Sequence, residues 1–363
     1  MFNSIASNLV SHDTNRSSDC FVRDGATGRT TRLTVAASGR QLPKGGACED
    51  ISADGRFAAL RLGRDVYLRD RLRNTTTIVS VSSDEERGNR SSSDASISSD
   101  GRFVAFASTA SNLVAGDRYD GYSHIFVRDV IRGTTEMASL SGSGAKIDGN
   151  SPSISADGRF IAFHGSGGLF VRDRTARASK KIPIDGYVYT LVISADGQHV
   201  AFQSNAELVG DDPNGGRGWD AFVHDLATGV TELASRSEVG NSGSSTTIGL
   251  SSDGRLVAYA SDAPDLVPGD TNQAQDIFVY DRDTKAITRV VSETGDVPNN
   301  THTDVTMTPD GRYLAFHSIG AFVPDKKPQR SCMPETGDRR TCFDVYIHDL
   351  RTEATFAVSR STN

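Results

Sequence analysis

Five polar side chains in this chain have the chemistry that a ligand site requires. Four of them end an apolar stretch of similar sequence, and the fifth precedes the last such stretch. Histidines together with a glutamine can ligate a transition metal, and a single histidine can act as a general base. An arginine favours an anionic group through a bidentate contact. We therefore predict a pocket for a sugar acid or a peptide carboxylate. The candidate ligand-binding residues are Arg61, His164, Gln203, His302 and His317.

A second candidate is a loop rich in carboxylate and amide oxygens. Asp270, Asn272 and Asp276 place oxygen ligands at short intervals, which suits Ca²⁺. The alternative is that these short side chains hydrogen-bond their own backbone in turns. The loop has no EF-hand pattern, and the sequence requires no cofactor. Ca²⁺ in such loops and a transition metal among the histidines are the two candidate cofactors.

Tandem repeats must position these residues. One phrase, an apolar strand, an Asp-Gly turn and a second apolar strand, occurs six times. Each copy is followed by a third strand that ends in aspartate, such as HIFVRD, and by a Thr-rich fourth strand. Four antiparallel strands per repeat are typical of a propeller blade, so we predict an all-β fold, a β-propeller. The copies are ISADGRFAAL from Ile51, ISSDGRFVAF from Ile97, ISADGRFIAF from Ile154, ISADGQHVAF from Ile193, LSSDGRLVAY from Leu250 and MTPDGRYLAF from Met307.

The repeat count predicts seven blades in a single domain over residues 1–363. Residues 47–360 contain six complete blades. Residues 1–36 read as a blade from the end of its second strand onward, without the innermost strand. The alternative is six blades with an N-terminal strap. In either case the long loops between second and third strands share one face, the rim, with the links between blades.

The phrases SxDGRxxAF and (I/V)(F/Y)VxD resemble the repeats of the TolB-like, WD-like propeller family, over essentially the whole chain. Members of this fold include periplasmic scaffolds, peptidase propellers and an oligogalacturonate lyase, so the fold alone does not select a function. The resemblance implies an extracytoplasmic binding or scaffold module that holds a protein, peptide or glycan at its rim. The alternative is a lyase or hydrolase with a histidine-containing site in the rim funnel, acting on an acidic sugar or peptide-like substrate.

Charge and hydropathy limit the classes of partner that the chain can bind. The formal net charge is −7 and no basic block is present, which argues against nucleic acid. No apolar run approaches the length that a membrane span needs. The residues after Met1 do not resemble a signal peptide, so we expect either a cytoplasmic chain or a mature one whose leader has been removed.

The four cysteines point to an oxidising compartment. Cys332 and Cys342 flank a short stretch of one long loop, which makes them the favoured disulfide pair. Cys20 with Cys48 is the weaker alternative, because the two occupy different strand positions in their repeats. Either bridge favours a periplasmic or secreted protein.

Overall fold

The structure of this 363-residue protein is a computed structural model. It describes residues 1–36, 38–210, 212–213, 215, 218–237, 248–271, 274–291, 302–318, 322–323 and 344–359. Contacts divide these residues into two compact units, Met1–Pro183 and Ile184–Ser359, which we call unit 1 and unit 2. Within the described ranges, no helix is long and apolar enough to cross a membrane.

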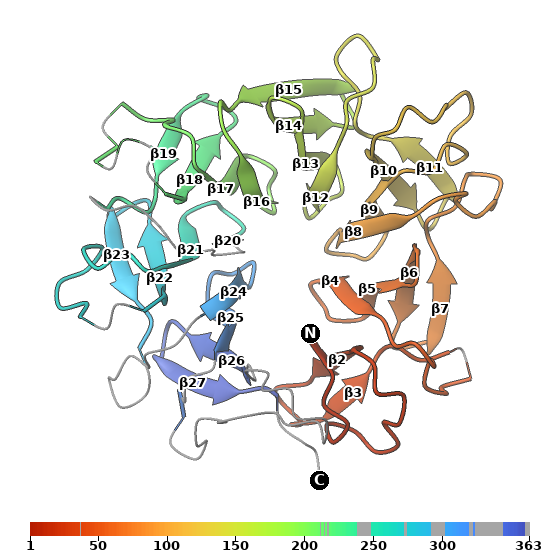
Figure 1. The fold of residues 1–363 in the computed structure, drawn as a ribbon, viewed down its shortest axis with the longest axis horizontal. Helices are drawn as coiled ribbons and strands as arrows, with labels where there is room; N and C mark the ends of the chain where they lie inside the picture. Colours follow the sequence, from red (N-terminus) through yellow and green to blue (C-terminus); the bar gives the residue numbers. More distant parts are fainter. Residues whose placement is uncertain are drawn as a thin grey trace. The chain divides into compact units, whose positions relative to one another are not determined.

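Unit 1 contains four antiparallel sheets (Figure 1). The N-terminal sheet has three strands, β1 (Phe2–Ser4), β2 (Asp19–Arg23) and β3 (Thr30–Arg32). Blade one consists of β4 (Ala47–Ile51), β5 (Phe57–Leu62), β6 (Asp65–Asp70) and β7 (Thr75–Ile78). Blade two consists of β8 (Ser92–Ile97), β9 (Phe103–Ser108), β10 (His124–Asp129) and β11 (Thr134–Met137). Blade three consists of β12 (Asn150–Ile154), β13 (Phe160–Gly165), β14 (Gly168–Asp173) and β15 (Ala178–Pro183).

Unit 2 contains three further sheets of four strands each. Blade four consists of β16 (Val188–Ile193), β17 (His199–Ser204), β18 (Asp220–Asp225) and β19 (Thr231–Leu233). Blade five consists of β20 (Ile248–Leu250), β21 (Leu256–Ser261), β22 (Asp276–Asp281) and β23 (Ala286–Arg289). Blade six consists of β24 (His302–Met307), β25 (Tyr313–Ser318), β26 (Asp344–Asp349) and β27 (Ala354–Ala357).

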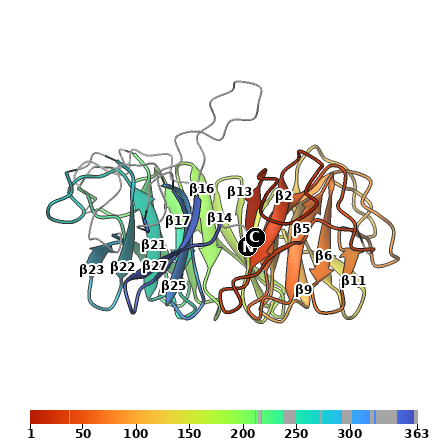
Figure 2. The ribbon, with the colours of Figure 1, turned by 90° about the horizontal axis from the view of Figure 1, so that it is seen from below.

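Each sheet pairs its strands in sequence order, which makes the protein an all-β propeller with seven blades. The prediction of an incomplete N-terminal blade is confirmed: β1 pairs with β2, and β2 with β3, so the sheet contains the counterparts of a second, third and fourth strand. In the side view of Figure 2, β2, β5 and β9 run between two faces of unit 1. Because the strands alternate in direction, the Asp-Gly turns lie on one face and the rim loops on the other.

The repeated phrase is explained by contacts at the Asp-Gly turn. In blade one, Gly55 has a φ of +69°, and Ser52 Oγ donates a 2.7 Å hydrogen bond to Asp54 Oδ1. Arg56 then reaches the end of the third strand, where its Nη2 lies 2.7 Å from Asp70 Oδ2. This hydrogen bond lowers the pKa of Asp70 to about 2. The Asp-Gly-Arg turn and the strand-ending aspartate therefore form one structural device.

Blade four lacks the arginine of this turn contact. Equivalent arginine–aspartate pairs close the other complete blades, namely Arg102–Asp129, Arg159–Asp173, Arg255–Asp281 and Arg312–Asp349. Blade four has Gln198 in place of the arginine, and His199 Nε2 lies 3.6 Å from Asp225 Oδ2.

The hydrophobic cores lie between successive sheets. In blade two, Phe106 on β9 pairs directly with Phe126 on β10, and their ring centroids are 5.9 Å apart. Both rings are fully buried and join residues of blade one, such as Val66, in one cluster. Each sheet therefore depends on its neighbour for burial of its apolar face.

Neighbouring Asp-Gly turns are also joined through their backbones. In unit 1, Ala53 N donates to Ser99 O at 3.2 Å, and Ser99 N donates to Ala156 O at 3.0 Å. In unit 2, Ser252 N donates to Pro309 O at 2.7 Å. The turn face of each unit thus carries hydrogen bonds from one blade to the next.

The disulfide in the structure is the pair that the sequence made the weaker alternative. Cys20 and Cys48 are bonded, with Cα atoms 5.1 Å apart. Their different strand positions are no obstacle, because β2 and β4 belong to adjacent sheets and contact each other. Cys332 and Cys342 lie outside the described residues.

Candidate functional site

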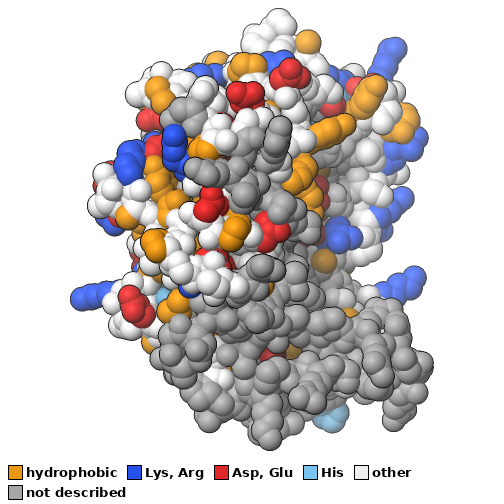
Figure 3. Space-filling model, turned by 60° about the vertical axis from the view of Figure 1, so that its left-hand side comes forward, with side chains coloured by type: hydrophobic (Ala, Val, Ile, Leu, Met, Phe, Trp, Pro, Cys, Tyr) orange, Lys and Arg blue, Asp and Glu red, His pale blue; other side chains and the backbone are white. Residues whose placement is uncertain are grey.

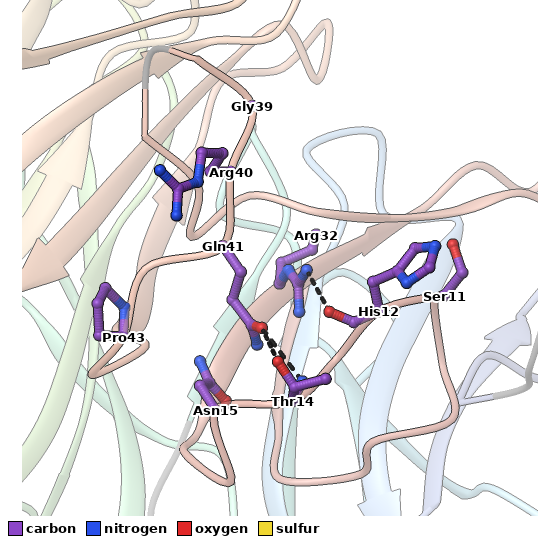
Figure 4. A pocket seen from close by; sticks show the side chains of 9 residues that line it. All are labelled: Ser11, His12, Thr14, Asn15, Arg32, Gly39, Arg40, Gln41 and Pro43. Atoms are coloured by element: carbon purple, nitrogen blue, oxygen red, sulfur yellow. Dashed lines mark hydrogen bonds between the residues drawn. The ribbon is translucent and has the colours of Figure 1, made fainter.

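The described rim of unit 1 contains a polar pocket of about 600 Å³ on the N-terminal blade (Figure 4). Two segments line it, the loop between β1 and β2 and the link between β3 and β4, together with Arg32 at the end of β3. Its volume is within the range of about 300–1,000 Å³ that is usual for ligand sites. The lining residues are Ser11, His12, Thr14, Asn15, Arg32, Gly39, Arg40, Gln41 and Pro43.

Buried carboxylates contact Arg32, one of the residues that line this pocket. Arg32 Nη1 lies 3.4 Å from Asp13 Oδ1 and 3.7 Å from Asp19 Oδ2. The three side chains are at most 9% exposed. Gln41 Nε2 donates to Asp13 at 2.7 Å, and Gln41 Oε1 accepts from the backbone and hydroxyl of Thr14. The amide of Gln41 therefore joins the two lining segments, as Figure 4 shows for its contact with Thr14.

The accessible polar groups of the pocket are hydrogen-bond donors rather than carboxylates. Ser11, His12 and Arg40 are exposed at the pocket, whereas the side chains of Asp13 and Asp19 are nearly inaccessible and hydrogen-bonded. A ligand would therefore meet a hydroxyl, an imidazole and a guanidinium before it met a carboxylate. Such a surface favours a polar ligand that carries an acceptor or a negative charge.

The ends of both lining segments are fixed. The loop from β1 leads into Cys20, the link from β3 leads into Cys48, and the disulfide joins them. Just before it, Gly46 N donates to Ser18 O at 2.9 Å. At Gly45 φ is +60°, and a Cβ there would lie 2.1 Å from the same oxygen. The two segments are thus held together at their base, which reduces the entropy that a ligand must remove.

Arg61 lies on β5 at the rim and is 44% exposed, but its charge is partly balanced. Its Nε donates a 2.9 Å hydrogen bond to Glu49 Oε1, and Glu49 Oε2 accepts from the backbone N of Ala95. Burial raises the pKa of Glu49, although the contacts to Ala95 and Arg61 act in the opposite direction. Arg61 is therefore both a potential anion contact and the counter-ion of a buried carboxylate.

The other predicted ligand residues occupy equivalent strand positions. His164 is half-buried on β13; burial lowers its pKa, against the opposing effect of Asp148. Gln203 on β17 is 0% exposed, and His317 on β25 is half-buried. His302 begins β24, where its backbone pairs with Ser318.

These residues do not all belong to one unit. Arg61 and His164 lie in unit 1, whereas Gln203, His302 and His317 lie in unit 2. The single funnel site that would combine them stays a prediction. The full burial of Gln203 means that its side chain has no surface to offer a ligand in this conformation.

The predicted Ca²⁺ ligands face an arginine. Arg289 Nη1 lies 3.0 Å from Asp270 Oδ1 and 3.5 Å from Asp276 Oδ2, and both carboxylates are nearly inaccessible. Asn272 lies outside the described residues. In the ranges that the structure covers, no group of three or more His, Cys, Asp and Glu side chains is arranged to hold a metal.

The sequence contained a signal for these buried ion pairs that we did not use. A Leu-Val pair precedes an aspartate in several rim loops, as in LVSHD, LVAGD and LVPGD. Their leucines are buried, and each aspartate pairs with a basic side chain that follows later in the chain. The pairs are Asp13–Arg32, Asp117–Lys146 and Asp270–Arg289. This regularity indicates that the loop aspartates stabilise the rim.

Comparisons with known proteins bear on the fold. No protein-family model matches the chain, and no curated protein matches its sequence. Among solved structures, TolB from Acinetobacter baumannii is 16% identical with a TM-score of 0.48, over 84% of this chain and 65% of that one. A putative TolB from Agrobacterium tumefaciens is 15% identical with a TM-score of 0.47, over 94% and 87%.

A third similar structure is an oligogalacturonate lyase in complex with manganese. It is 13% identical with a TM-score of 0.45, over 93% of this chain and 71% of that one. Two TolB structures are thus among the solved structures to which this chain is similar. Such distant similarity concerns the chain fold, so the function must be argued from this protein's own residues.

Proposed function

We propose that this protein is an extracytoplasmic binding module that holds a polar ligand at the rim of unit 1, in the pocket of the N-terminal blade. The observation that carries the proposal is the junction of both pocket-lining segments by the Cys20–Cys48 disulfide. A disulfide at the base of a polar, solvent-open pocket supports a preformed binding site. It also supports a compartment in which disulfides persist.

Pocket composition supports binding rather than catalysis. No carboxylate is among its lining residues, and the two nearby, Asp13 and Asp19, are already engaged by Arg32 and Gln41. The accessible groups are suited to hydrogen bonding, and no described cluster provides a metal. The alternative of a lyase or hydrolase in a histidine-containing funnel stays a prediction without a supporting contact in the described residues. The ligand class that we propose is a protein, a peptide or a glycan held at the rim.

A pocket-filling substitution tests this proposal. Ser11 is exposed and lines the pocket, so Ser11→Trp should fill it with an indole. Ala26 is also exposed. It lies in the hairpin between β2 and β3, at the turn end of the same sheet, so Ala26→Trp is the matched control. The purified chain would be screened against arrays of synthetic peptides and glycans, and each hit measured with both variants.

We expect Ser11→Trp to abolish binding of the hits and Ala26→Trp to leave it intact. Equal binding by all three proteins would refute the pocket as the site. Turnover of an array member, blocked by substitution of His164 or His317 but not of Ser11, would instead establish the enzyme alternative.

A further inference from the structure

Basic side chains stand on three rim segments of unit 1 that adjoin one another as one strip. We call it the basic strip: Arg40 and Lys44 in the link from β3 to β4, Arg61 and Arg64 at the rim end of blade one, and Arg87 and Arg90 in the link from β7 to β8. All six are exposed. They are far apart in sequence, which is why no basic block is visible there.

Backbone contacts join the first two segments of the strip. A Cβ built on Gly46 would lie 2.9 Å from Arg61 O and 2.4 Å from Leu62 Cδ2, so the first link passes directly against the rim end of β5. In the short turn between β5 and β6, Arg64 O accepts a 2.8 Å hydrogen bond from the backbone N of Ser92, the first residue of β8, where the link from β7 ends. The two links therefore border blade one on either side.

The second half of the strip reaches the long rim loop of blade two. Asn89 N donates to Asn112 Oδ1 at 2.9 Å, which joins the link to that loop. The guanidinium of Arg90 lies 3.8 Å from the ring centroid of Tyr119, a cation–π contact. Tyr119 and its neighbour Tyr122 are 51% and 61% exposed. The strip thus runs from the pocket to an exposed pair of tyrosines.

The acidic partners within the strip are buried beneath it. Glu49 is 11% exposed against 44% for Arg61, and Asp65 is 0% exposed against 54% for Arg87. The positive ends of both pairs therefore face solvent. Arg40, Lys44 and Arg64 have no ion pair within the described residues. Residues 1–46 contain six Lys and Arg against three Asp and Glu, a net charge of +3 in a chain of −7.

Resting on the proposed function, we infer that the basic strip binds an acidic, extended polypeptide segment of a partner protein whose path ends in the N-terminal pocket. Exposed carboxylates on flexible side chains match guanidinium groups at unequal spacings. Exposed Arg and Tyr are the residue types enriched in protein interfaces.

Charge reversal on the strip provides the test. The strip variant carries Arg40→Glu, Arg64→Glu and Arg90→Glu, none of which removes the counter-ion of a buried carboxylate. The control carries Arg29→Glu, Arg73→Glu and Arg132→Glu, the same charge change on the turn face, where Arg73 and Arg132 are each 74% exposed. Binding of a fluorescent oligoglutamate peptide would be measured by anisotropy at low and physiological salt.

The wild-type chain and the control should bind the peptide, more weakly at higher salt. The strip variant should bind at least about tenfold more weakly. The single substitution Arg64→Gln, which perturbs folding less, should weaken binding in the same direction. Equal affinity of strip variant and control, or no binding by the wild-type chain, would overturn the inference.

Two further measurements distinguish polypeptide from other acidic ligands, and the strip proposal from the pocket proposal. Tighter binding of single-stranded DNA or polygalacturonate than of oligoglutamate would show that the strip does not select polypeptide. If Ser11→Trp abolishes an array hit while the strip variant leaves oligoglutamate binding unchanged, the pocket stands and the strip fails. The reverse result would leave the strip and remove the pocket.

Discussion

Cys20 and Cys48 join the third-strand equivalent of the incomplete N-terminal blade to the innermost strand of blade one, at a sequence separation of 28. The N-terminal sheet has no innermost strand of its own among the described residues, and it contacts β4 through β1 and β2. A covalent bond therefore reinforces the place where one sheet lacks a strand.

The first prediction concerns this bond. Replacement of both cysteines, Cys20→Ala with Cys48→Ala, should lower the free energy of unfolding of unit 1 by roughly 3 kcal/mol in the chain-entropy account. Urea unfolding of oxidised wild-type protein and the double variant would measure the difference. Identical midpoints would show that packing of β2 against β4 holds the blade unaided.

The second prediction concerns pH and Glu49. Because burial raises its pKa in the folded state, protonation of Glu49 favours folding; this contribution is complete at acidic pH and is lost as pH rises through the raised pKa. Glu49→Gln should therefore gain stability relative to wild type on going from about pH 4 to pH 7. Thermal unfolding of both proteins across this range tests it. A constant difference would mean that Arg61 and Ala95 fully offset the cost of burial.

Blade four offers the third prediction. Gln198→Arg should restore the turn pair with Asp225 that the other complete blades have. A partly exposed pair of this type contributes about 0.5 kcal/mol, and less at high salt. Unfolding of unit 2 with and without salt would measure it. The variant Gln198→Met, which adds no charge, should not reproduce a salt-dependent gain.

The fourth prediction asks whether Arg289 or Ca²⁺ balances the charges of Asp270 and Asp276. With Arg289 beside two buried carboxylates, we expect Ca²⁺ to leave the melting temperature of the wild-type chain unchanged. Arg289→Gln should lower stability, because it leaves Asp270 and Asp276 without their counter-ion, and Ca²⁺ should then restore part of the loss. A Ca²⁺-dependent rise in the wild-type protein would revive the predicted metal site.

The architecture followed from the sequence because its determinants are local. The Asp-Gly turn, the arginine after it and the strand-ending aspartate recur at fixed spacing, so residues such as Arg56 and Asp70 could be placed before their contact was known. The blade count, including the partial N-terminal blade, depended only on this regularity.

The candidate site followed less well because its determinants lie between repeats. The pocket needs Gln41 to join two segments, and the basic strip needs the segments that carry Arg40, Arg64 and Arg90 to adjoin one another. Repeat alignment placed Arg61 and His164 correctly at equivalent strand positions. It could not show that Glu49 forms an ion pair with Arg61.

The backbone hydrogen bonds between Asp-Gly turns have a consequence for how such a chain grows. Ser99 accepts from the turn before it and donates to the turn after it, so a blade brings one donor and one acceptor to its neighbours. A duplicated repeat inserted between two blades would arrive with both groups already matched, so neither turn would lose its backbone hydrogen bond. Gene duplication could thus lengthen the array one repeat at a time, and the near-identical turn phrases of blades one to three are what recent events of that kind would leave behind.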